Sequence, residues 1–173
     1  MPGLLALGAI HDESGGDIQG GQEIVQLAED LADACWHMYE STATGLAPEA
    51  ILFNNDGSVR GIANTKWNIL RPESVESFFI LFELTGDEKY RERAHKVWEA
   101  FETHCKAPHG YGAHPDVFDV NHKCCNGNDD KQETFWMAET LKYLYLIQQP
   151  DNGINMMDYV FNTEAHPFKI IKD

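Results

Sequence analysis

Residues 70–104 read LRPESVESFFILFELTGDEKYRERAHKVWEAFETH, a stretch that predicts two helices joined by a tight turn. The first helix is expected over Pro72–Leu84, because proline suits the first turn of a helix, where its missing N–H costs nothing. Gly86 is expected to end it, since glycine readily adopts the left-handed conformation found after many helices. Asp87 can then cap a second helix over residues 88–104, whose apolar positions recur at helical spacing. This segment therefore predicts a helix pair.

Helical spacing recurs on both sides of this pair, at Gln22–Tyr39 and Lys131–Gln148. Between the helices, Asn54–Gly57 is a hairpin turn signal, and the Gly- and Asn-rich segment Pro108–Asp130 predicts a loop with room for a short hairpin. The tail Tyr159–Pro167 has no helical period. Strands and helices do not alternate, so we expect a mainly α fold with short β-hairpins rather than an α/β fold.

The composition indicates one globular domain and excludes some classes of partner. The 173 residues include 28 acidic and 13 basic side chains, a formal charge of −15. No basic face can neutralise phosphates, so we expect no nucleic-acid binding. Most of the acids are expected on solvated helix faces, although clustered carboxylates also attract hard cations. No apolar stretch approaches the ~20 residues that span a membrane, and the N-terminus lacks the basic region of a signal peptide.

The cysteines do not predict a zinc site. The chain contains Cys35, Cys105, Cys124 and Cys125, and the adjacent pair lacks the spacing of two residues typical of zinc-binding loops. The cysteines alone do not indicate a redox compartment.

Glu73 and Glu76 are the first candidate functional residues. Because they are three residues apart, they share one face of the predicted helix. Both lie in its first turn, where the helix dipole favours negative charge, and this effect alone is enough to explain them. The functional interpretation is a carboxylate pair in which one group activates water while the other holds water or a metal ion.

Two further groups of residues are compatible with sugar or cation binding. Phe135 and Glu139 are four residues apart on one predicted helix, and a ring beside a carboxylate suits the apolar face and the hydroxyls of a sugar. Thr163 and Glu164 offer hydroxyl, carbonyl and carboxylate oxygens, which calcium prefers. Taken alone, each group is as well explained by packing or by an exposed tail, and His166 is better explained as a structural or exposed residue.

Four motifs follow one another in the chain: GLAPE at residues 45–49, LRPESVES at 70–77, FWMAETLKYLYL at 135–146 and VFNTEAHP at 160–167. In this order they closely resemble class I α-1,2-mannosidases of glycoside hydrolase family 47, and the resemblance covers nearly the whole chain. It implies the C-terminal helix pairs of the family's seven-hairpin (α/α) barrel. We therefore expect residues 1–173 to be the C-terminal part of one catalytic domain, without the N-terminal part of the barrel.

The resemblance also implies an activity and a setting. Family 47 enzymes remove α-1,2-linked mannose from N-glycans with inversion, and they need calcium. The implied substrate is a high-mannose N-glycan, and the implied location is the lumen of the endoplasmic reticulum or Golgi. The chain is more similar to the processing mannosidases than to the branch that enhances degradation of misfolded glycoproteins.

Several residues match positions with a role in calcium binding or catalysis in the family. Glu73 matches the proposed general base. Thr163 matches the direct calcium ligand, through both of its oxygens. Glu76, Glu139 and Glu164 match carboxylates that hold calcium-bound waters or the sugar.

Other residues match substrate-binding positions. Phe135 matches the aromatic residue beneath the mannose ring, and Arg71 and Glu49 match residues that line the cleft. Through their sugar contacts, Glu76 and Glu139 are also expected to bind substrate.

The departures from the family pattern limit these expectations. The family's general acid, a glutamate, and a further catalytic aspartate have no counterpart in this chain, so we expect no activity from residues 1–173 alone. Cys35 resembles one half of a family disulfide whose partner lies in a His-Leu-x-Cys-Phe motif that this chain lacks. Two other interpretations remain open: a non-catalytic, calcium-dependent glycan-binding or mannosidase-like remnant, and an acidic helical interaction protein.

Overall fold

The computed structural model describes residues 1–11, 18–56, 58–61, 65–122, 124, 131–149, 151 and 153–171. The chain divides into two compact units. The first unit comprises Met1–Ala34, Pro72–His95 and Phe135–Asp173, and the second comprises Cys35–Arg71 and Lys96–Thr134. None of the helices in the described part of the chain is both long enough and apolar enough to cross a bilayer.

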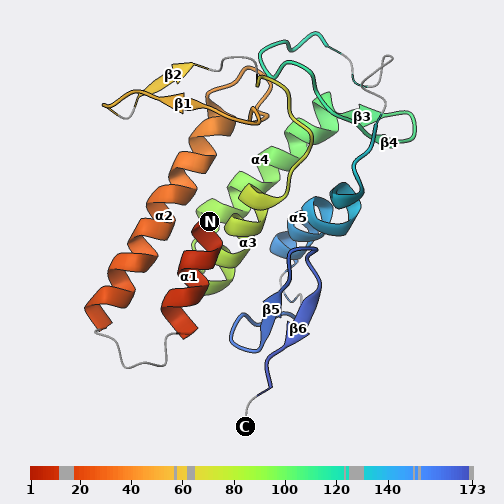
Figure 1. Cartoon of the computed structure of the whole chain (residues 1–173). Helices are drawn as coiled ribbons and strands as arrows, with labels where there is room; N and C mark the ends of the chain where they lie inside the picture. Colours follow the sequence, from red (N-terminus) through yellow and green to blue (C-terminus); the bar gives the residue numbers. More distant parts are fainter. Residues whose placement is uncertain are drawn as a thin grey trace. The chain divides into compact units, whose positions relative to one another are not determined.

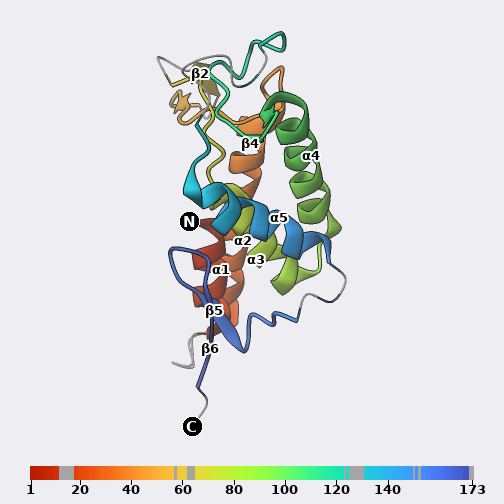
Figure 2. The same cartoon turned by 90° about the vertical axis from the view of Figure 1, so that its right-hand side faces the viewer.

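Helices dominate the first unit. Its elements are α1 (Pro2–His11), the start of α2 (Ile18–Glu40), α3 (Glu73–Thr85), the start of α4 (Glu88–His104), a π-helical turn η1 (Trp136–Thr140), α5 (Leu141–Gln148) and the strands β5 (Tyr159–Phe161) and β6 (Pro167–Lys169). The two strands form an antiparallel hairpin, which lies below α5 in Figure 2.

The helix α3 is the core of the first unit, with α1 and α5 packed on either side of it (Figure 1). Phe78, Phe79 and Leu81 are fully buried. The approach of α1 is close: a Cβ atom added to Gly3 would lie 2.8 Å from Cδ1 of Ile80. A side chain at position 3 would therefore require Ile80 to shift before α1 could pack this tightly on α3.

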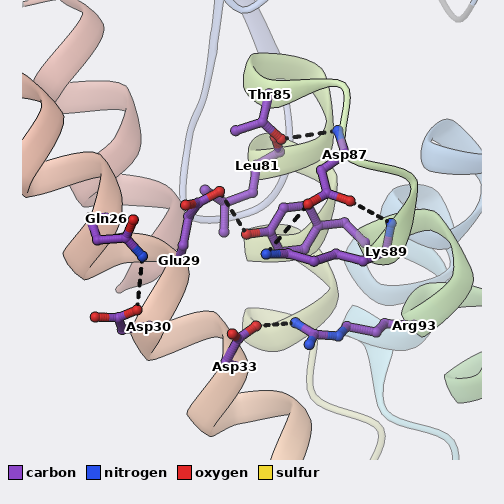
Figure 3. A network of polar contacts seen from close by, with 10 residues as sticks. Gln26, Glu29, Asp30, Asp33, Leu81, Thr85, Asp87, Lys89 and Arg93 are labelled. Atoms are coloured by element: carbon purple, nitrogen blue, oxygen red, sulfur yellow. Dashed lines mark hydrogen bonds and ion pairs between the residues drawn. The ribbon is translucent and has the colours of Figure 1, made fainter.

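A seam of polar contacts joins α2 to α4 within the first unit (Figure 3). Arg93 donates to Asp33 over 2.5 Å, and the Tyr90 hydroxyl donates to Glu29 over 3.5 Å. The Tyr90 ring itself is fully buried and stacks on Phe78 of α3 at a centroid distance of 6.3 Å. The polar ends of Arg93 and Tyr90 thus hold α4 against α2, and the Tyr90 ring holds it against α3.

The predicted helix pair at residues 70–104 is confirmed, including its connection. Gly86 adopts φ 68°, and its N–H donates to the carbonyl of Phe82 over 2.8 Å, which ends α3. The carboxylate of Asp87 accepts the N–H of Lys89 over 2.9 Å and caps α4. Pro72 takes the N-cap position of α3.

One predicted helix begins later than expected, and another packs through its small side chains. The helix expected at Lys131–Gln148 is not formed at residues 131–133, where the side chain of Gln132 accepts the N–H of Tyr111 over 2.9 Å. In α2, confirmed as a helix, the larger apolar side chains Ile24, Leu27 and Leu31 are 41%, 50% and 37% exposed. The packed face of α2 carries the fully buried alanines 28 and 32 instead.

The second unit contains two short hairpins and the later parts of α2 and α4. The strands are β1 (Leu52–Phe53) with β2 (Val59–Gly61) and β3 (Lys106–Ala107) with β4 (Gly110–Tyr111). The predicted turn at Asn54–Gly57 is confirmed for its described residues, and Gly57 lies outside them. A short connection, residues 65–71, then leads to α3.

Candidate active site

The first two glutamates of the candidate site are placed by the start of α3. Glu73 is the first residue of the helix and is exposed, whereas Glu76 is half-buried one turn later. The hydroxyl of Ser77 donates to the carbonyl of Glu73 over 2.9 Å and accepts the N–H of Gly3 over 3.3 Å. This buried hydroxyl connects the first turn of α3 to the start of α1.

The carboxyl group of Glu76 faces the buried ring of Tyr143 on α5. The Tyr143 hydroxyl donates to Oε1 of Glu76 over 3.3 Å. Burial raises the pKa of Glu76, and the charge of Glu73 adds to this, while the Tyr143 hydrogen bond and the N-terminal ammonium act in the opposite direction. The same contact, together with burial, raises the pKa of Tyr143, so its hydroxyl stays a proton donor.

Glu139 joins these two carboxylates from a different part of the chain. It lies in the π-helical turn η1, a feature that often marks functional sites in helices. Burial raises the pKa of Glu139, and the charges of Glu164, Glu73 and Glu76 raise it further. The charges of Glu73 and Glu76 from α3 and of Glu164 from the β5–β6 turn therefore act on Glu139 of η1, and we call these four residues the glutamate cluster.

The turn between β5 and β6, residues 162–166, carries both Thr163 and Glu164. Both side chains are exposed. The side-chain oxygen of Asn162 accepts the N–H groups of Glu164 and His166, over 3.0 and 2.9 Å. Thr163 is thus presented on a turn with internal hydrogen bonds, beside a glutamate of the cluster.

Aromatic packing supports this turn from below. The Phe161 ring, immediately before the turn, lies edge-on to Phe79 of α3 at 5.9 Å and tilted against Tyr143 of α5 at 5.5 Å. Since Tyr143 also bonds Glu76, one apolar contact region underlies the turn and part of the cluster.

The remaining predicted site residues are divided between the units. Phe135 is half-buried and directly precedes η1 in the first unit. Glu49 and Arg71 belong to the second unit, where Nε of Arg71 donates to Oε2 of Glu49 over 2.6 Å. The other oxygen of Glu49 accepts the N–H of Ile69 over 3.2 Å. The structure thus brings Glu49 and Arg71 together.

The donor set of the cluster suits a hard cation held through water. Among the described residues, no three His, Cys, Asp or Glu side chains are close enough to hold a metal ion directly. The cluster nevertheless offers only oxygen atoms, and the charges of its members disfavour ionisation of Glu76 and Glu139. A nearby cation would relieve this repulsion, so the residues fit calcium in the water-mediated arrangement.

Sequence reasoning missed several residues that shape this site. Tyr143 and Lys142 follow Glu139 by four and three residues, so their helical spacing was an available signal. Lys142 donates to the carbonyl of Ala165 over 2.6 Å. The roles of Asn162 and Phe161 had no signal in the sequence, because they depend on the hairpin formed by β5 and β6.

Comparison with known proteins finds similarity to α-1,2-mannosidases over nearly the whole chain. The profile of glycosyl hydrolase family 47 matches residues 1–170. The chain is 44% identical over 172 residues to the mannosyl-oligosaccharide 1,2-alpha-mannosidase MNS1 of Arabidopsis thaliana. It is 41% identical over 172 residues to mannosyl-oligosaccharide 1,2-alpha-mannosidase IA of Sus scrofa. Each alignment covers 98% of this chain.

A solved structure, an alpha-1,2-mannosidase from Trichoderma reesei, superposes with a TM-score of 0.78 at 30% sequence identity and covers 98% of this chain. This likeness confirms the prediction of a mainly α fold of the (α/α) barrel type. The chain spans 28% and 25% of the length of the plant and pig relatives, and 37% of the Trichoderma structure.

Proposed function

Because the chain belongs to glycosyl hydrolase family 47, we propose that its glutamate cluster is one wall of a calcium-dependent α-1,2-mannosidase site. The observation that supports this most directly is that the charges of Glu73, Glu76 and Glu164, which lie on two other segments, act on Glu139. Favourable charges at a helix start explain the first two glutamates alone. They do not explain why the η1 and β5–β6 glutamates gather beside them, at a cost in repulsion.

Glu73 is the general base in this proposal. Inverting hydrolysis requires one carboxylate that removes a proton from water while an acid on the opposite side protonates the leaving oxygen. Glu73 is exposed, so water and sugar can reach its carboxylate, and its backbone is fixed by Ser77. Glu76 lies deeper and is held by Tyr143, which suits a role in orienting water rather than in removing its proton.

Thr163, Glu76, Glu139 and Glu164 are the residues that would hold calcium, Thr163 directly and the glutamates through water. When bound, the ion would neutralise the cluster and orient sugar hydroxyls. Thr163 is exposed, which suits a direct ligand. Calcium takes six to eight oxygens, so most of its ligands would be water or substrate.

The proposed substrate is a high-mannose N-glycan, encountered in the secretory pathway lumen. Phe135 would pack beneath the mannose ring, and Glu76 and Glu139 would accept hydrogen bonds from its hydroxyl groups. The Arg71–Glu49 pair would bind neighbouring sugars, since a charged pair at the surface offers both donors and acceptors.

Calcium binding is the first test of the proposal. We expect residues 1–173 to melt at a higher temperature with calcium than with magnesium, because ligand binding to the folded state stabilises it. Thr163→Val should remove most of this gain. Thr103→Val, at an exposed threonine of α4, is the matched control and should keep it. Unchanged calorimetric calcium binding in Thr163→Val would contradict the assignment of the ligand.

Catalysis is tested separately. We expect no release of mannose from α-1,2-mannobiose by residues 1–173, since Glu73 supplies only the base and a missing acid typically costs about a hundredfold or more. In a complete family catalytic domain carrying this segment, Glu73→Gln should lower kcat much more than it changes KM. Glu92→Gln, at an exposed position of α4, should change neither. Calcium-dependent mannoside binding with no turnover in the complete domain would favour a glycan-binding protein instead.

A further inference from the structure

The β5–β6 turn contains a strained residue that must be held in place by its surroundings. Ala165 has φ 54°, in the left-handed region that non-glycine residues rarely adopt. This conformation costs on the order of 1–2 kcal/mol for a residue with a side chain. Ala165 is also fully buried. Strain of this kind persists only where neighbouring contacts stabilise it.

Most of those contacts come from within the turn. The side-chain oxygen of Asn162 accepts the N–H groups of Glu164 and His166. Its backbone carbonyl accepts the N–H of Ala165 over 3.0 Å. These bonds fix the shape of the turn. They do not fix its position relative to the helices, because all of them join atoms of residues 162–166.

Lys142 provides a polar contact from another element. Its ammonium donates to the carbonyl of Ala165 over 2.6 Å, a short distance typical of a charge-assisted hydrogen bond. Lys142 lies in the first turn of α5, three residues after Glu139. The contact therefore links the backbone that carries Glu139 to the residue that follows Glu164.

The chemistry of α5 makes this lysine conspicuous. The helix has the sequence LKYLYLIQ, in which Lys142 is the single charged residue. It is half-buried, so its stem packs against the protein while its ammonium reaches the turn. Its positive charge also opposes the effect of the neighbouring carboxylates on Glu139. An ammonium at this place both bonds the turn and offsets the repulsion within the cluster.

We propose that Lys142 is a positioning residue, whose ammonium holds the turn 162–166 against α5 and thereby sets where Thr163 and Glu164 stand relative to Glu139. The significance of this position for calcium and sugar rests on the proposed function. The contact itself and its effect on the turn are independent of the proposed function.

The first experiment measures the turn directly. Amide hydrogen exchange at residues 164–166 is compared in the wild type, Lys142→Met, Lys142→Gln and Lys142→Arg. Both uncharged variants should exchange roughly tenfold faster at these amides, the effect of losing one hydrogen bond to a charged group. Arginine keeps the charge and the donors, so Lys142→Arg should restore most of the protection. Lys169→Met, at an exposed lysine of β6 in the same hairpin, is the control and should exchange like the wild type.

The pattern of exchange separates positioning from a general structural role. We expect the faster exchange to be confined to the turn, with the amides of α3 and α5 and the melting temperature nearly unchanged. Unchanged exchange in both uncharged variants overturns the proposal. Faster exchange spread equally over the turn, α3 and α5 also overturns it, because Lys142 would then stabilise the whole unit.

Calcium titration by calorimetry connects the contact to the site. Lys142→Met should bind calcium several-fold more weakly than the wild type, and Lys142→Arg should recover most of the affinity. Unchanged or tighter binding in Lys142→Met overturns the positioning role, because the ammonium would then have no effect or only repel the ion. If the wild type binds no calcium while the exchange results hold, the proposed function fails and the fixing of the turn by Lys142 stands.

Discussion

The connection in the second unit and the β5–β6 turn in the first share an unusual backbone feature. Among the described residues, the non-glycine residues with positive φ are Leu70, at 66°, and Ala165, at 54°. Each adjoins a predicted site residue: Leu70 precedes Arg71, and Ala165 follows Glu164. In both places an asparagine side chain accepts a backbone N–H two residues later, from Leu70 over 2.8 Å and from Glu164 over 3.0 Å.

The two asparagines differ in burial and in what they hold. Asn68 is 5% exposed, donates to the carbonyl of Ala47 over 2.7 Å, and exchanges two backbone hydrogen bonds of 2.8 Å with His114. Asn162 is exposed, and its side chain accepts hydrogen bonds from Glu164 and His166 of its own turn. The left-handed conformation of Leu70 is therefore held by a buried side chain. That of Ala165 is held by an exposed turn and by the hydrogen bond from Lys142. We infer that the connection before α3, at residues 68–71, is rigid and that the turn at residues 162–166 is adjustable.

Removal of the two asparagine side chains tests this difference most strongly. Asn68→Ala should lower the free energy of unfolding by roughly 2–4 kcal/mol, because the buried carbonyl of Ala47 and the N–H of Leu70 both lose their partner. Asn162→Ala should cost only about 0.5–1.5 kcal/mol, since water can replace its hydrogen bonds. Urea unfolding measures both. Equal losses in the two variants would contradict the proposed difference in rigidity.

Protonation of His114 in acid should loosen the connection at residues 65–71, because His114 exchanges backbone hydrogen bonds with Asn68. This side chain is fully buried, and neither ring nitrogen has a hydrogen-bond partner among the residues that the structure describes. Its ring lies edge-on to those of His104 and His122, at 5.8 and 5.2 Å. Burial lowers the pKa of His114, and the two neighbouring histidines lower it further against the opposing charges of the aspartates at positions 116 and 119.

The sign of the effect follows from this depressed pKa. The neutral ring is favoured in the folded state, so its contribution to stability is present above the unfolded pKa of about 6.5 and is lost as the pH falls through the lower folded pKa. Protection factors of the Asn68, Leu70 and His114 amides should therefore fall in mild acid. His114→Phe should remove most of this fall, and His95→Phe, at an exposed histidine of α4, should leave it in place.

The glutamate cluster should respond to pH in the opposite direction. The pKa of Glu76 is raised, mainly by burial, so its contribution is fully present below the unfolded pKa of about 4.3 and is lost as the pH rises through the folded pKa. In the presence of a calcium chelator, Glu76→Gln should raise the melting temperature at pH 7 and change it little at pH 4. Glu92→Gln serves as the control. A gain at pH 4 as large as that at pH 7 would show that ionisation of Glu76 is not the cause.

The sequence predicted those features that depend on local signals. The ends of α3 and α4 were predicted because Pro72, Gly86 and Asp87 act within a few residues of their own positions. The π-helical turn η1 was not predicted, since nothing in the motif FWMAETLKYLYL marks such a turn. Nor were the left-handed residues Leu70 and Ala165, because neither is glycine or asparagine and their conformation depends on distant partners.

The candidate site was predictable to a similar extent. The spacing of Glu73 and Glu76 placed both on one face of α3, as the structure shows. Nothing in the spacing of residues related Glu139 or Glu164 to them, and only the resemblance to family 47 supplied that link. The reason is physical: the packing of Phe161 on α3 and α5 and the bond from Lys142 of α5 hold the β5–β6 hairpin in place, and these are contacts between distant segments.

The smallest expected effect is also the most direct test of strain in the turn. Ala165→Gly removes the side chain that disfavours φ 54°, a gain of about 1–2 kcal/mol. It also loses one buried methyl group, about 0.8 kcal/mol, and adds about 0.5–1 kcal/mol of unfolded-state entropy. These terms nearly cancel, so the free energy of unfolding should change by less than about 1 kcal/mol. Ala34→Gly, at an exposed position inside α2, should cost about 1 kcal/mol because it has no strain to relieve. If Ala165→Gly instead costs clearly more than Ala34→Gly, the turn stores little strain, and the contact of Lys142 with Ala165 positions an already relaxed turn.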